Sequence, residues 1–220
     1  MKLTLEAIGI GDGPGAPLPQ TSAEATTNVP GIAAVETEGA PTLASLIAGG
    51  RMKPETGRVL IDGVDDAAAI RAAFALIDTP TVAEPFADLS VLTVVREELA
   101  LADHHGDREN ARAFLEAVGL TAFENAPVKT IPTEARIRLL TELAILRPGI
   151  KGLVITSPER HGGDTEAWFR VVTDLSARGF TVMVVTGVAA ALHVQRLLPI
   201  DDGVDTPTTP TAVSPESLQS

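Results

Sequence analysis

The feature that most constrains the fold is a helix that runs through a Pro-Gly break into a short apolar strand, within residues 131–164. Apolar side chains recur at three- and four-residue spacing after Thr133, which predicts an amphipathic helix with Thr133 as its N-terminal cap. Pro148 and Gly149 end that helix, because proline disfavours helical backbone in the preceding residue and glycine lets the chain turn. Residues 152–156, Gly-Leu-Val-Ile-Thr, are apolar without polar alternation, which predicts a strand buried on both faces of a mostly parallel sheet. A functional site is expected at the carboxyl end of such a strand.

The same patterns along the rest of the chain predict an α/β fold. Apolar runs predict further strands at residues 2–8, 31–35, 58–61, 74–77 and 180–186. Periodic apolar residues with capping residues predict helices at residues 42–48, 65–71, 88–102, 107–118 and 164–177. Residues 9–20 are rich in glycine and proline and are predicted to form a connection of turns.

Composition excludes several kinds of partner. With 220 residues, 45% of them hydrophobic and 21% charged, the chain is long enough for one sizeable core and for one domain or at most two. The net charge of −12, with only 17 lysines and arginines, argues against nucleic acid, anionic lipid and phosphate ligands. The absence of cysteine excludes a disulfide framework and fits a reducing compartment. We expect no signal peptide, because the N-terminal residues, MKLTLEAIGIGDG, contain no long apolar region. We also expect no direct membrane insertion, because the longest apolar run, residues 180–192, is too short to span a bilayer.

Three segments resemble parts of the ABC-transporter ATPases, in the order in which that family has them. Residues 131–164 resemble the stretch from the signature motif, LSGGQ, through its helix to the Walker B strand and the D-loop. Residues 31–63, with LIAGG followed by GRVLIDG, resemble the Walker A segment and the strand after it. Residues 88–102, DLSVLTVVREELALA, resemble the LTVRENLAL helix of the family. The resemblance rests on the order and framing of these segments rather than on the motifs themselves.

The resemblance implies a P-loop NTPase-like (ABC ATPase) fold. Such a fold has a mostly parallel sheet, an N-terminal antiparallel β region and a helical subdomain, here expected as an insert at about residues 88–146. The ABC-ATPase-like domain is predicted to cover residues 1–199. Residues 200–220 contain four acidic residues and many Pro, Thr and Ser residues without periodicity, and they are predicted to be a disordered tail.

The Walker A positions implied by the resemblance are Gly39, Ala40, Pro41 and Thr42. A P-loop holds a triphosphate with backbone N–H groups, a lysine that reaches the β- and γ-phosphates, and a Ser or Thr hydroxyl on Mg²⁺. Ala40 stands in place of the lysine and Pro41 in place of the hydroxyl residue, and proline also lacks a backbone donor. Thr42 keeps a hydroxyl one position later, while Glu36 adds negative charge beside the expected phosphates.

The other motif positions have lost their chemistry as well. Walker B supplies an aspartate for the metal and a glutamate for the attacking water, but Thr156 and Ser157 stand there. Gly187 stands in place of the switch histidine, and Asp78 lies near the position of the Q-loop glutamine. No G-K-[ST] sequence occurs anywhere in the chain. We therefore predict these residues to be degenerate positions of a nucleotide site, with no catalytic residue, no metal ligand and no bound cofactor.

Histidines offer two further candidate sites. His104 and His105 lie near acidic residues, but adjacent residues of a helix point in different directions, so a solvated helix end is the simpler interpretation than a metal site. His161 lies in a polar loop after the strand 152–156, where a catalytic group would be useful. A loop histidine at such a turn is interpreted as structural or exposed.

Two hypotheses about function follow. The first is a non-catalytic subunit, a pseudo-ATPase, that docks on a membrane permease-like protein or on a second ABC-type ATPase as a structural or regulatory component. A homodimer is a further arrangement in keeping with the family. The second is a working ATP-binding subunit of an ABC transporter, which would bind ATP and Mg²⁺ and hydrolyse the nucleotide. Either protein is expected in the cytoplasm, reaching the inner face of the membrane only through a partner.

Overall fold

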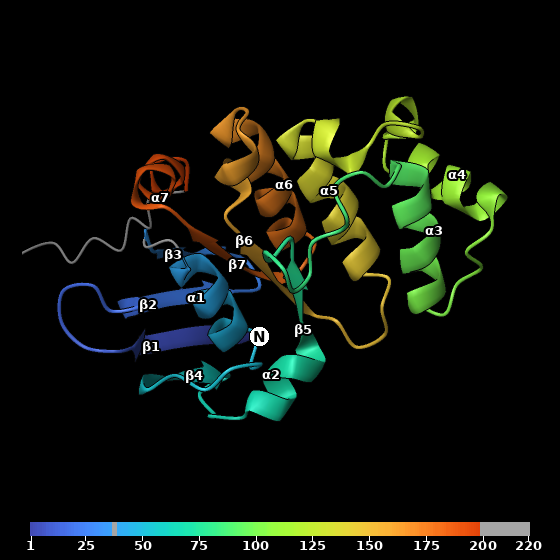
Figure 1. The fold of residues 1–220 in the computed structure, drawn as a ribbon. Helices are drawn as coiled ribbons and strands as arrows, with labels where there is room; N and C mark the ends of the chain where they lie inside the picture. Colours follow the sequence, from blue (N-terminus) through green and yellow to red (C-terminus); the bar gives the residue numbers. More distant parts are fainter. Residues whose placement is uncertain (37–38, 199–220) are drawn as a thin grey trace, which may run out of the picture.

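An antiparallel sheet forms the N-terminal part of the chain in the computed structural model, which describes residues 1–36 and 39–198 (Figure 1). Its strand order is β2-β1-β4, with β1 at Lys2–Ile10, β2 at Leu18–Thr26 and β4 at Thr56–Ile61. The predicted connection of turns, residues 9–20, is therefore shorter than expected, because both ends of it belong to strands. Strand β2 was not predicted, and its polar sequence is ordered by pairing with β1 along most of its length.

The second sheet is wholly parallel and has the order β3-β7-β6-β5. Its strands are β3 at Gly31–Ala34, β5 at Phe74–Ile77, β6 at Gly152–Thr156 and β7 at Thr181–Thr186. Every residue of β6 and β7 is buried. The prediction that residues 152–156 form a strand buried on both faces is confirmed, and β6 and β7 are neighbours as the resemblance requires.

Seven α-helices and three 3₁₀ segments lie within the described part of the chain. The helices are α1 at Ala40–Ala48, α2 at Ala67–Ala73, α3 at Val91–Leu101, α4 at Arg108–Ala117, α5 at Thr133–Ala144, α6 at Thr165–Ala177 and α7 at Val188–Gln195. The 3₁₀ segments are η1 at Thr121–Phe123, η2 at Val128–Thr130 and η3 at Pro158–His161. None of these helices is long and apolar enough to cross a bilayer.

The parallel sheet separates two hydrophobic cores. Alternate residues of a strand point to opposite faces, so Val154 faces the core around α1 and the antiparallel sheet, while Leu153 and Ile155 face the core around α5 and α6. Helix α1 contacts strands of both sheets. This double burial explains why the sequence of β6 is apolar at every position but its ends.

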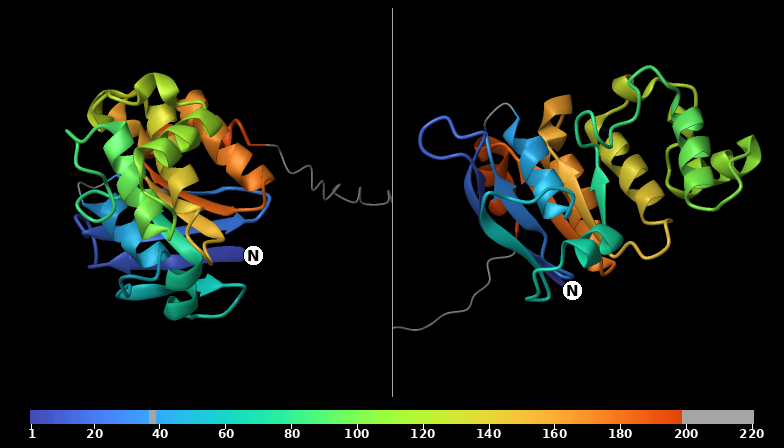
Figure 2. Two further views of the ribbon diagram at one scale, coloured as in Figure 1. Left: turned by 90° about the vertical axis from the view of Figure 1, so that its right-hand side faces the viewer. Right: turned by 60° about the horizontal axis from the view of Figure 1, so that its bottom comes forward.

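The segment between β5 and β6 is helical and lies to one side of the sheets. Helices α3 and α4 extend away from the strands beyond α5, as Figure 1 and the right-hand view of Figure 2 show. Ser90 caps α3 and Asp107 caps α4, each accepting a hydrogen bond from a backbone N–H of the first turn. The predicted cap at Thr133 is wrong: Pro132 precedes the first turn of α5, and the Thr133 hydroxyl donates to the Gly162 carbonyl at 2.7 Å instead. The predicted tail, residues 200–220, lies outside the described residues.

Candidate functional site

The carboxyl ends of the parallel strands bring the predicted site residues to one edge of the sheet. Asp78 follows β5, Thr156 ends β6 and Ser157 follows it, and Gly187 lies between β7 and α7. The remaining predicted residues, Gly39 to Thr42, lie at the N-terminus of α1. Because neighbouring parallel strands end at the same edge, these four segments meet there, where α/β proteins commonly bind ligands.

The N-terminus of α1 carries no charge in its first turn. Gly39 is the residue before the helix and gives no side-chain cap, and Pro41 occupies the second helical position. The Ala40 side chain is fully buried, whereas Pro41 and Thr42 are partly exposed. A helix N-terminus attracts anions through its free N–H groups, but proline removes one of these donors and no cationic side chain lies in this turn.

A chain of three buried hydroxyls fills the space between α1 and the ends of β5 and β6. The Thr156 hydroxyl donates to Ser45 Oγ at 2.7 Å, and Thr79 Oγ1 lies 2.8 Å from Thr156 Oγ1. All three side chains are fully buried. Hydroxyls are neutral at pH 7, so this arrangement satisfies its own hydrogen bonds and supplies no negative charge for a metal ion.

Two carboxylates of the chain occupy the N-terminus of α7. The Gly187 N–H donates to Glu159 Oε1 at 2.8 Å, and the Val188 N–H donates to Glu36 Oε1 at 3.1 Å. Glu36 follows β3 and Glu159 belongs to η3 after β6, so the two carboxylates come from segments that follow the strands on either side of β7. Negative charge at a helix N-terminus is stabilised by the helix dipole, which makes these contacts favourable.

Asp78 is the centre of a buried ion cluster. Arg136 on α5 donates to both of its carboxylate oxygens, from Nε at 2.8 Å and from Nη2 at 2.6 Å. His161 Nε2 lies 2.7 Å from Asp78 Oδ2, and Arg160 Nη2 lies 3.1 Å from Oδ1 and donates to the Asp78 carbonyl. Arg160 also pairs with Glu84 at 2.9 Å. The cluster joins the end of β5, the first turn of α5 and η3.

The electrostatics of this cluster keep Asp78 ionised. Its burial alone raises the pKa of the carboxyl group, but hydrogen bonds from Arg136 and His161, together with the charges of Arg136 and Arg160, outweigh burial. The pKa of Asp78 therefore lies far below its ordinary value. The backbone of Asp78 is left-handed, with φ of 54°, a conformation that aspartate adopts more readily than most residues.

Sequence reasoning found Asp78 and His161 but not their connection. His161, interpreted from the sequence as structural or exposed, has the carboxylate of Asp78 as its partner. Arg136 and Ser45 were missed, although a polar residue on the buried face of an amphipathic helix indicates that a buried partner exists. His104 and His105 are exposed after α3, and the described residues include no group of three or more potential ligands placed to hold a metal ion.

Comparisons with known proteins agree with the fold. No protein-family model matches the chain. No curated protein matches its sequence. Solved structures of ATP-binding cassettes match it over most of its length. A nucleotide-free ATP-binding cassette from an ABC transporter has a TM-score of 0.59 and 16% sequence identity, covering 88% of this chain and 85% of that one.

Two further structures are similar to the same degree. MJ0796, a bacterial ABC transporter cassette with a dimeric structure, has a TM-score of 0.58 and 18% identity, covering 86% of this chain and 90% of its own. The protein cbiO1 from Clostridium perfringens, part of the ABC transporter complex cbiONQ, has a TM-score of 0.54 and 16% identity, covering 84% of this chain and 78% of its own. The chain thus has the α/β, P-loop NTPase-like fold of ABC transporter ATP-binding cassettes, as predicted.

Proposed function

We propose that the chain is a non-catalytic ABC-ATPase-like subunit that docks on a membrane permease-like protein or on a partner ATPase. The fold is that of an ATP-binding cassette, while Ala40, Pro41, Thr156, Ser157 and Gly187 lack the groups that ATP hydrolysis requires. A fold does not by itself carry an activity, so the residues at the site decide the proposal. The protein would act in the cytoplasm and reach the inner face of the membrane through its partner.

The observation that carries the proposal is the pair of carboxylates at the N-terminus of α7. Glu159 and Glu36 accept hydrogen bonds from the first backbone N–H groups there, next to the position where the family has its switch histidine. A triphosphate in this space would meet like charges at close range, which is unfavourable even in water. With no lysine at Ala40, phosphates would find no compensating charge at the N-terminus of α1, and with no carboxylate at Thr156 the Walker B position offers Mg²⁺ no charged ligand.

A direct test is calorimetric titration of the purified chain with Mg-ATP, together with an assay of phosphate release. We expect neither heat of binding nor release of phosphate, while a cassette with complete motifs, measured in parallel, gives both. Micromolar binding with turnover would contradict the proposal. It would favour the alternative, a functional ATP-binding subunit of an ABC transporter whose site is built from other residues.

The segment after Asp78 offers the surface for a partner. Phe86 is 83% exposed and Val82 48% exposed, and both line a hollow of about 720 Å³ together with residues of the ion cluster, Arg136 and His161. An exposed aromatic side chain beside a hollow is typical of a protein interface. In the ABC ATPases the Q-loop region and the helical subdomain contact the membrane partner. The structural neighbour cbiO1 is itself part of an ABC transporter complex, which supports a partner of this kind.

Capture of partners with the tagged full-length chain tests this docking surface. Phe86→Ser removes the exposed aromatic side chain, and Val64→Ser is the matched control, because Val64 is 60% exposed between β4 and α2, outside the helical segment. We expect a permease-like protein or an ABC-type ATPase to be captured by the unmodified chain and by V64S, and to be lost with F86S. Capture that is equal with both variants would contradict a partner site at Phe86. Sedimentation of the chain alone tests the homodimer.

A further inference from the structure

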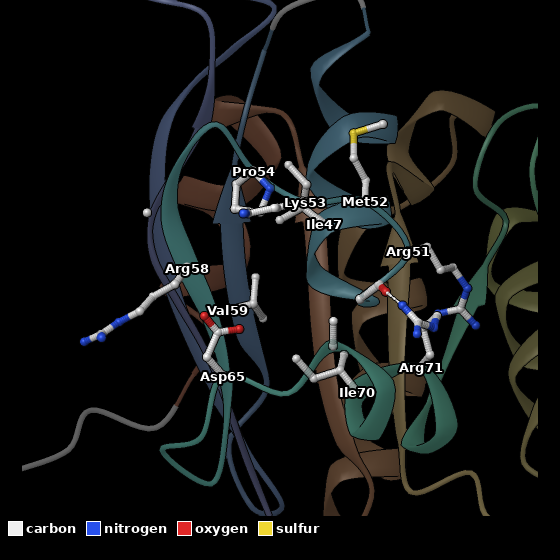
Figure 3. A pocket seen from close by; sticks show the side chains of 13 residues that line it. Ile47, Arg51, Met52, Lys53, Pro54, Arg58, Val59, Asp65, Ile70 and Arg71 are labelled. Carbon is white, nitrogen blue, oxygen red and sulfur yellow. Dashed lines mark hydrogen bonds between the residues drawn. The ribbon is translucent and has the colours of Figure 1, made fainter.

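A pocket of about 430 Å³ lies at the C-terminal end of α1, the end opposite to Gly39 (Figure 3). Its walls come from α1, the α1–β4 connection, β4 and the start of α2. Ile47, Val59 and Ile70 form an apolar floor. Gly50, with φ of +67°, closes one side where a Cβ atom would meet the Ala67 carbonyl at 2.6 Å. This size and apolar lining are those of sites for small organic molecules.

The charge of the pocket is opposite to that of the protein. Its lining has four cationic residues and one acidic residue, in a chain whose net charge is −12. The cations are Arg51, Lys53, Arg58 and Arg71. The acidic composition of the whole chain predicts no affinity for phosphate ligands, but a local concentration of cations creates a positive field of its own.

Three of these cations have no carboxylate partner within the described part of the chain. Arg58 pairs with Glu6 at 2.6 Å and points away from the pocket (Figure 3). For Arg51, Lys53 and Arg71, no carboxylate of residues 1–36 and 39–198 lies within ion-pair distance. Since these three cations form no ion pair with the described residues, their charge is available to an anionic ligand.

The two arginines lie side by side at one end of the pocket and donate to backbone carbonyls (Figure 3). Arg51 donates to the Gly49 carbonyl at 2.7 Å and to the Phe74 carbonyl at 3.1 Å, and Arg71 donates to the Gly50 carbonyl at 2.7 Å. A guanidinium has five N–H donors, so both keep donors for a ligand. Burial, and then the charges of Arg71 and Arg147, lower the pKa of Arg51, so an anion beside it would relieve unfavourable interactions.

The single carboxylate fixes the orientation of a ligand. Asp65 lies on the side of the pocket near Val59, across from the two arginines (Figure 3). An anionic group is repelled there and attracted at the arginine end. The apolar floor between the two ends would contact an uncharged body. We propose that this pocket binds a small organic anion, whose carboxylate or phosphate group contacts Arg51 and Arg71 and whose apolar body lies on Ile47 and Ile70.

Titration of the ¹⁵N-labelled full chain, followed by NMR, tests the proposal. The probes are hexanoate and hexyl phosphate, with hexanol, hexylammonium and inorganic phosphate as controls. We expect one or both amphiphilic anions to give saturable shifts of the Gly50, Arg51 and Ile70 amides. The three controls should bind at least about tenfold more weakly, since each lacks one of the two kinds of contact. Which anion saturates the site identifies the head group.

Variants of the lining cations make the test specific. Arg71→Met should weaken binding about tenfold, because it removes charge-assisted hydrogen bonds. Lys53→Met should weaken it less, and its exposed side chain makes no hydrogen bond or ion pair with described residues, so its loss leaves the fold intact if R71M proves unstable. Arg58→Met is the matched control and should not change binding, since that cation already pairs with Glu6.

Three results would overturn the proposal. The first is an absence of saturable shifts at these amides with either anion up to about 10 mM, a concentration that fills even a millimolar site. The second is binding that R71M and K53M leave unchanged. The third is inorganic phosphate binding as tightly as hexyl phosphate, which would mean that the apolar floor contributes nothing to binding.

Discussion

Arg136 holds both carboxylate oxygens of Asp78 across the boundary between the parallel sheet and the helical segment. The bonds measure 2.8 and 2.6 Å, and both side chains are almost fully buried. A planar guanidinium matches a carboxylate in this two-point geometry, which fixes direction as well as distance. The pair therefore sets the position of α5 relative to the end of β5, and His161 and Arg160 add η3 to the same point.

Replacing Asp78 should destabilise the protein strongly. Asp78→Asn keeps the size of the side chain but leaves the buried Arg136 guanidinium without its counter-charge. Removal of one partner from a buried ion pair costs about 3 to 5 kcal/mol of unfolding free energy, and we expect a loss near the lower end because the amide still accepts a hydrogen bond. Urea unfolding followed by circular dichroism measures the change. Arg58→Gln, in an exposed pair, is the control and should leave the midpoint unchanged.

The same carboxylate predicts a loss of stability in acid. The pKa of Asp78 is lower in the folded chain than its ordinary value, so below that ordinary value the unfolded chain binds more protons than the folded one. Its contribution is present at neutral pH and falls as the pH drops below about 5. The unfolding free energy, measured from pH 7 to pH 3, should fall more steeply for the natural chain than for D78N. Parallel curves would show that Asp78 does not titrate abnormally.

The order of strands and helices was predictable because local patterns determine it. Apolar runs without alternation revealed β6 and β7, and the Pro-Gly break after α5 revealed where the crossover returns to the sheet. Strand β2 was missed, because its sequence, LPQTSAEAT, has buried apolar residues only at Leu18 and Ala25. Pairing with β1, rather than its own propensity, makes that segment a strand.

The places of the candidate residues in the fold were predictable, but their contacts were not. The order of segments led to Asp78, Thr156 and Gly187, each of which lies at the carboxyl end of a parallel strand. The bonds between Asp78 and Arg136 join residues 58 apart, and that between Ser45 and Thr156 joins residues 111 apart. One sequence contains no record of which distant polar residues meet. Only a buried polar residue within an apolar pattern indicates that a partner exists.

The chain of hydroxyls should contribute to stability through its middle member. Thr156→Val keeps the shape of the side chain but leaves the Ser45 and Thr79 hydroxyls without their shared partner. Buried hydroxyls that lose a partner cost about 1 to 3 kcal/mol, which urea unfolding resolves. Thr121→Val, at an exposed position of η1, is the matched control and should have no measurable effect. An equal midpoint for T156V and the natural chain would mean that the hydroxyls contribute nothing.

The carboxylate of Glu159 at the N-terminus of α7 predicts an effect on local opening of the helix rather than on the unfolding of the whole chain. Glu159→Ala removes the acceptor of the Gly187 N–H, whereas the Val188 N–H keeps its bond to Glu36. Loss of a cap costs about 1 kcal/mol, so exchange of the Gly187 amide hydrogen with solvent should accelerate about five- to tenfold. Hydrogen exchange followed by NMR measures this rate, and the amides of β6 should serve as the internal control because that strand is buried throughout. Glu159→Gln keeps an acceptor of the same length and should restore much of the protection. If E159A left the exchange of Gly187 unchanged, the carboxylate of Glu159 would not hold the start of α7.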